Sequence, residues 1–77
     1  MQRYEMVREI FNSCSNNQMR DVFIEEIQAD TLEPWVQPFL SGTQVSWEKH
    51  ESPDGGIIFD INTDGMMQRI TFTELAG

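Results

Sequence analysis

Residues 60–65, D-I-N-T-D-G, carry the residue types of a calcium-binding loop. Asp60, Asn62 and Asp64 place side-chain oxygens at alternate positions, and a glycine stands at the sixth, as in an EF-hand. The twelfth position of such a loop needs a bidentate glutamate, and here it is Thr71, whose hydroxyl cannot supply two charged oxygens. Both flanks alternate like strands, whereas an EF-hand has helices there. The last two residues of the stretch instead predict a two-residue hairpin turn, because Asp-Gly tolerates positive φ.

His50, Cys14 and nearby carboxylates are the other residues that could do chemistry. A histidine beside acids such as Glu48, Glu51 and Asp54 can ligate a metal or transfer protons. The chain has one histidine and one cysteine, so a tight zinc or iron site lacks ligands. The cysteine is expected at the C-terminal end of a helix, where the dipole disfavours a thiolate.

We therefore predict no catalytic, cofactor-binding or metal-binding residues and no enzymatic activity. The alternative is a small metal- or ligand-binding protein, or an enzyme, that uses His50, Cys14 and the carboxylates near them. Binding of a small molecule between helices and sheet also stays open at this point.

Length and charge limit the classes of partner. The 77 residues suffice for a single small globular domain, 1–77, with one core. A net charge of -8 and five scattered Lys and Arg residues argue against nucleic acid and against an anionic membrane. No apolar run approaches the roughly 20 residues that a spanning helix needs. The lone cysteine and the charged N-terminal segment lead us to expect a cytoplasmic protein.

The first half of the chain is expected to be partly helical. Residues 2–13 predict an amphipathic helix, whose apolar stripe comprises Tyr4, Met6, Val7, Ile10 and Phe11. Residues 20–28 fit a helix face as well, but their Val-Phe-Ile run favours a strand. Residues 32–40 predict a short, kinked helix, because Pro34 is acceptable in a first turn and Pro38 is not comfortable in an interior.

From residue 43 the apolar period changes to two, which predicts an antiparallel meander with strands over 44–50, 56–63 and 66–73. A turn at 64–65 places Asp60 opposite Arg69, and a three-residue loop at 53–55 places Trp47 opposite Ile61. Lys49 then lies at the periphery of the core, where its stem can cover Phe59.

The predicted fold class is α+β: helix, strand and short helix, followed by a three-stranded antiparallel meander. Both helices are expected to pack on one sheet face, the one that carries Val45, Trp47, Ile57, Phe59, Ile61, Ile70 and Phe72. Trp35 and Phe39 are expected to join Trp47 and Phe59 in the core. The strand at 20–28 could join either edge of the meander.

The outer face of the predicted meander offers a possible interaction surface. Ile58 and Met67 share this face, and an exposed methionine suits an adaptable partner surface. His50 points the same way, across from Ile58. We therefore expect a small acidic binding or accessory module that acts by protein–protein interaction. The partner would bind the exposed sheet face or an edge strand, and could be a second copy of the chain.

Overall fold

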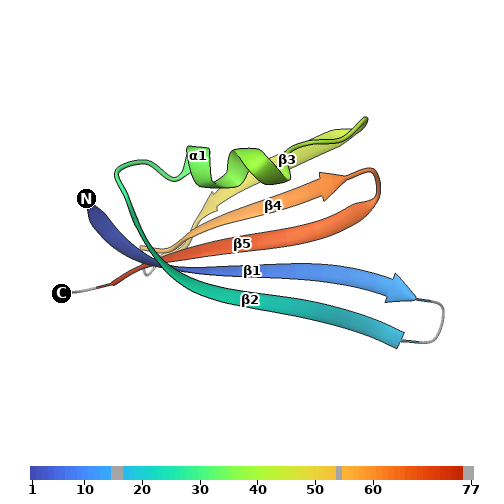
Figure 1. Cartoon of the computed structure of the whole chain (residues 1–77), viewed down its shortest axis with the longest axis horizontal. Helices are drawn as coiled ribbons and strands as arrows, with labels where there is room; N and C mark the ends of the chain where they lie inside the picture. Colours follow the sequence, from blue (N-terminus) through green and yellow to red (C-terminus); the bar gives the residue numbers. More distant parts are fainter. Residues whose placement is uncertain (15–16, 54, 76–77) are drawn as a thin grey trace.

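Five strands form one antiparallel sheet, with a short helical segment on one side (Figure 1). The computed structural model describes residues 1–14, 17–53 and 55–75. The spatial order of the strands is β2-β1-β5-β4-β3. The elements in chain order are β1 (Gln2–Cys14), β2 (Asn17–Ala29), α1 (Glu33–Val36), the 3-10 helix η1 (Gln37–Phe39), β3 (Val45–Glu51), β4 (Ile57–Thr63) and β5 (Met66–Glu74).

The predicted α+β class is wrong, because the segment expected to form the first helix is the strand β1. It pairs antiparallel with β2 on one side and with β5 on the other, so it lies inside the sheet. The strand expected over 20–28 exists as β2, but it joins neither edge of the meander: it is the outer strand beyond β1. The molecule is therefore mostly sheet, with one short helical segment.

Arg8 explains why β1 resembles a helix in sequence. Tyr4 and Met6 point from β1 into the core, and the next residue of that alternation is Arg8. Its guanidinium lies 4.2 Å from the centre of the Phe39 ring, and its Nε donates to Gln68 Oε1 at 3.2 Å. Stacking and hydrogen bonding make the arginine acceptable on this face. A charged residue at this position interrupts the alternation of apolar and polar residues from which a strand would be predicted.

The meander is confirmed, including its register. Asp60 pairs with Arg69 across β4 and β5, and Trp47 pairs with Ile61 across β3 and β4. The first connection closes with Ser52 N–H donating to the Gly56 carbonyl at 2.7 Å. Position 54 of that loop lies outside the described residues. In the second connection Asp64 takes a φ of 51° and is followed by a glycine, as a two-residue hairpin turn requires.

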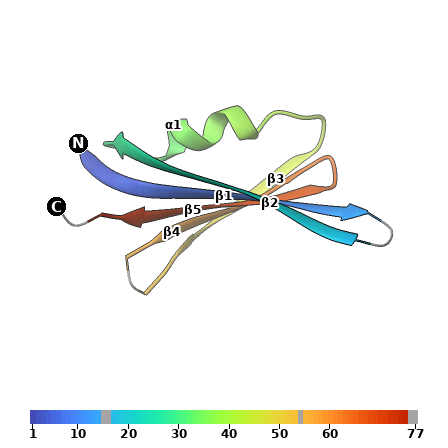
Figure 2. The same ribbon diagram turned by 60° about the horizontal axis from the view of Figure 1, so that its bottom comes forward.

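The helical segment packs over one side of the sheet, here called the helix face, and leaves the other side, the open face, without a second layer in the described part of the chain (Figure 2). Leu32 and Val36 from the segment are buried against the sheet. Lys49 Nζ donates to Glu33 Oε1 at 3.1 Å and so links β3 to α1. The buried core residues are Met6, Ile27, Ala29, Leu32, Val36, Phe59, Ile61, Ile70 and Phe72.

Two tryptophans expected in the core are only partly covered. Trp47 is 46% exposed and Trp35 is 37% exposed, whereas Phe59 is fully buried. Trp47 lies on β3, an edge strand of the sheet, and in the described part of the chain this strand is flanked by β4 on one side only. Phe39 is half-buried against the core. The core is therefore centred on β4, β5 and β1 rather than on the three strands of the meander.

Candidate interaction surface on the open face

A row of apolar and hydroxyl side chains crosses the open face. The pairings place Ile24 opposite Val7, Val7 opposite Thr71, and Thr71 opposite Ile58. These four residues come from β2, β1, β5 and β4 and alternate with the buried core positions, so they share the face away from α1. Ile24 is 68% exposed and Ile58 is half-buried. The row is here called the apolar row.

Met67 and Phe11 form a second apolar pair on this face. They are opposite each other on β5 and β1, and they are 47% and 38% exposed. Asn62, next to them on β4, donates from Nδ2 to the Met67 sulfur at 3.3 Å. The structure thus places Ile58 and Met67 on one face, as expected, but in separate rows.

Sequence reasoning missed the contribution of β1 and β2 to this surface. Val7 and Phe11 were assigned to the stripe of a helix, and Ile24 to a strand whose neighbours were unknown. The alternation of Arg3, Glu5, Val7, Glu9 and Phe11 along one side of β1 was a signal that could have identified the first two. It is weak because three of those five positions are charged.

Charged side chains cross the open face in the row next to the apolar row. Arg69 Nε donates to Asp60 Oδ1 at 2.9 Å, and the other oxygen of that carboxylate lies 3.4 Å from His50 Nε2. His50 Nε2 also lies 3.4 Å from Glu48 Oε2. The hydrogen bond and the charge of Asp60 raise the pKa of the Arg69 guanidinium, and the charge of Glu9 adds to this. The row therefore carries paired charges, with the acids in excess.

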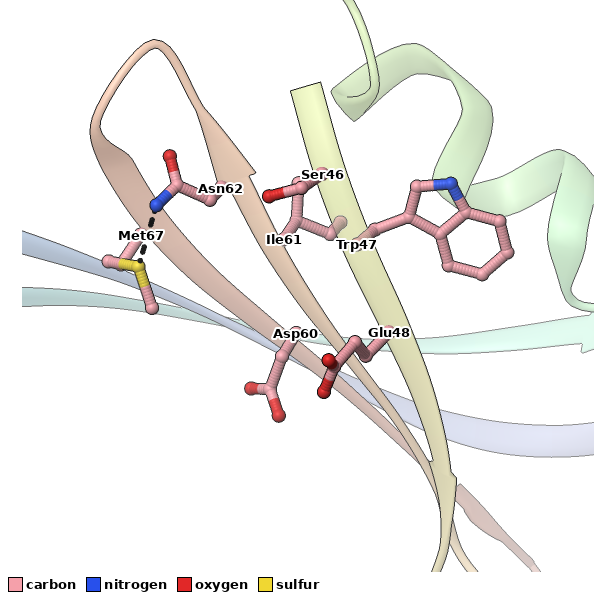
Figure 3. Close-up of a pocket in the computed structure, with 7 residues that line it drawn as sticks. All are labelled: Ser46, Trp47, Glu48, Asp60, Ile61, Asn62 and Met67. Carbon is pink, nitrogen blue, oxygen red and sulfur yellow. Dashed lines mark hydrogen bonds between the residues drawn. The ribbon is translucent and has the colours of Figure 1, made fainter. Parts of the chain in front are cut away.

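A hollow of about 310 Å³ lies over β3 and β4 beside these charges (Figure 3). The carboxylates of Glu48 and Asp60 lie on the same side of the ribbon, whereas Trp47 points to the opposite side, toward the helical segment. Met67 and Asn62 form another part of the wall. Within residues 1–14, 17–53 and 55–75, no three His, Cys, Asp or Glu side chains are grouped so that they could hold a metal ion. The hollow thus offers hydrogen-bond acceptors and apolar contacts.

The alternative site would need His50 and Cys14 together, and the backbone separates them. His50 lies across from Ile58, in line with the row that contains Val7. Cys14 stands seven residues further along β1, a distance of roughly 23 Å along an extended strand. Its side chain lies outside the part that the structure describes.

Within the 60–65 stretch, the side-chain oxygens of Asp60, Asn62 and Asp64 have protein partners. Asp60 accepts from Arg69, and Asn62 Oδ1 accepts from the Gly65 N–H at 3.1 Å. Asp64 Oδ1 accepts from the Gln44 N–H at 2.8 Å, so it ties the β4–β5 turn to the start of β3. The three side chains are therefore used in separate contacts of the sheet and its turn.

Comparison with known proteins identifies no family for this chain. Neither the protein-family models, nor the curated proteins, nor the solved structures include a match to the chain. Among the described residues, no helix is long and apolar enough to cross a membrane.

Proposed function

We propose that this protein is a non-enzymatic binding module, and that it binds a partner protein through the open face of its sheet. The observation that supports the proposal is the apolar row, which lies uncovered between charged rows on a face without a second layer in the described part of the chain. Apolar side chains gathered on an otherwise polar surface are typical of protein–protein contact sites.

The charge of the face favours a basic partner. Among its described side chains there are five carboxylates, from Glu5, Glu9, Glu26, Glu48 and Asp60, and two guanidinium groups, from Arg3 and Arg69. A second copy docked face to face would bring these acids against each other, which costs free energy at moderate salt. A protein surface with apolar side chains flanked by Lys or Arg is complementary in both respects.

The test is affinity capture from the source cells with matched baits, followed by titration of the isolated partner. Ile58→Glu should abolish binding, because it puts a charge into the apolar row at its β4 end. Ser41→Glu adds the same charge at an exposed position after η1 and should bind like the wild type. Binding should weaken as salt rises. An isolated partner that binds Ile58→Glu and wild type equally would remove the open face as the site.

A further inference from the structure

The outer strand β2 carries three consecutive exposed apolar residues. Val22, Phe23 and Ile24 are 45%, 53% and 68% exposed. Successive residues of a strand point to opposite faces, so both faces of the sheet are apolar at this edge. The strand has 13 residues, and among the described residues its sheet neighbour is β1, on one side only. A long apolar edge of this kind is a template for pairing with another strand.

The backbone of the edge is oriented for such pairing. The carbonyl of Arg3 accepts from the Leu75 N–H at 2.9 Å, so odd-numbered residues of β1 direct their polar groups toward the β5 side. Even-numbered residues of β1 therefore bond to β2, and Arg8 exchanges its bonds with Phe23. It follows that Val22 and Ile24, the neighbours of Phe23, direct their N–H and C=O groups outward.

The opposite edge of the sheet is protected. The strand β3 has seven residues, and four of the seven are ionisable: Glu48, Lys49, His50 and Glu51. Short length and charged side chains, including Lys49 and Glu51 on the helix face, are standard means of preventing edge-to-edge pairing. Of the two edges of the sheet, β2 is therefore the one that is open to a further strand.

We propose that β2 pairs antiparallel with β2 of a second copy, about a twofold axis through Phe23, to form a continuous ten-stranded sheet. This register places Val22 opposite Ile24 and Phe23 opposite the partner's Phe23, so apolar residues meet apolar residues on both faces. Moving the axis by one residue places Phe23 opposite either Asp21 or Glu25. The side chains therefore favour the register in which the axis passes through Phe23.

One contact in this register is unfavourable, and it makes the register testable. Asp21 of one copy faces Glu25 of the other on the helix face, twice by symmetry, and like charges directly opposite each other destabilise a strand pair. Each copy also carries a net charge of -8. Because edge pairing buries a small area, we expect a weak dimer that forms at high micromolar concentration and tightens as salt rises.

The first measurement is sedimentation of the full chain over a concentration series. Ile24→Pro removes an outward N–H and leaves the β1–β2 ladder intact, so it should weaken the dimer about 10-fold or more while thermal unfolding shows a folded monomer. Ile24→Ala keeps the N–H and should have a smaller effect. A wild-type chain that stays monomeric, a folded Ile24→Pro variant that dimerises like the wild type, or open-ended assembly would each overturn the proposal.

The second measurement uses charge and does not depend on the proline variant folding. Glu25→Lys turns both repulsive contacts into attractive ones and should tighten the dimer several-fold. Glu5→Lys makes the same change in net charge on the open face of β1, away from the edge, and should tighten it less. Equal effects of the two changes would overturn the register.

Dimerisation through β2 and partner binding at the open face use different surfaces, so experiments can contradict either one without the other. Ile58 lies three strands away from β2, so Ile58→Glu should leave the dimer unchanged while it abolishes partner binding. Salt should strengthen the dimer and weaken partner binding. Loss of the dimer in Ile58→Glu, with the variant still folded, would show that copies meet through the face and not through the edge.

Discussion

Single residues at the border of the core show how position in the sheet decides burial. Trp47 and Phe59 lie on neighbouring strands with ring centres 5.9 Å apart. Phe59 has strands on both sides and is fully buried, whereas Trp47 on the outer strand is 46% exposed. Arg8, by contrast, reaches the helix face from a strand inside the sheet and is tolerated through its contacts with Phe39 and Gln68.

Truncating the two aromatic rings should therefore have different costs. Phe59→Ala should lower the free energy of unfolding by about 3 to 5 kcal/mol, the range for emptying a buried aromatic site. Trp47→Ala should cost about 1 to 2 kcal/mol, because much of its ring is already in water. Urea unfolding of both variants measures this. Equal losses would mean that the indole is covered in solution, for example by a partner or a second copy.

Among the elements, the β4–β5 turn shows how one loop connects three strands. Asp64 accepts hydrogen bonds from the Thr43 and Gln44 N–H groups at 3.2 and 2.8 Å, and its own N–H donates to the Gln44 carbonyl at 2.8 Å. Its φ of 51° is a conformation that aspartate and asparagine tolerate better than most residues. The acidic stretch that resembles a calcium loop thus has a structural use in this turn.

Asp64→Ala should destabilise the fold by about 1 to 3 kcal/mol, since two N–H groups lose their acceptor and alanine is strained at positive φ. Asp64→Gly removes the strain, but the two N–H groups still lose their acceptor. The stability of this variant should therefore lie between that of Asp64→Ala and that of the wild type. Thermal unfolding gives the ranking.

Millimolar calcium should leave the wild-type Tm unchanged in the same experiment, because the Asp60 and Asp64 carboxylates already have protein partners. A calcium-dependent rise in Tm that disappears in Asp64→Ala would instead indicate a metal site.

At the scale of the whole molecule, the order of the strands sets a gradient of stability. The molecule measures 43 × 25 × 21 Å, and the hairpin of β1 and β2 extends along its longest axis beyond the turn between β4 and β5 (Figure 1). The fully buried residues lie on β4 and β5, with Val36 of α1 covering them. Opening should therefore begin at the two outer strands and reach the central strands last.

Amide hydrogen exchange at low protein concentration checks this gradient. The amides of Phe59, Ile70 and Phe72 should exchange slowest, because their strands lie inside the sheet. On β2 the Phe23 amide should exchange more slowly than those of Val22 and Ile24, which point outward. Uniform protection of all three in the monomer would show that another segment covers the edge.

The sequence by itself determined the meander, its register and both of its turns, because alternation, turn residues and the pairing of Asp60 with Arg69 all indicate one local solution. It also located the short helical segment and the strand over 20–28. Only the tertiary structure decided the conformation of residues 2–13. With a charged residue at position 8 and the apolar Val7 and Phe11 on the opposite face, this segment fits the apolar period of a helix as well as that of a strand. The contacts of Arg8 with Phe39 and Gln68 form only when the chain folds, so the sequence does not reveal them. Pairing with β2 and β5 supplies hydrogen bonds on both sides of β1, and this outweighs its local helical pattern.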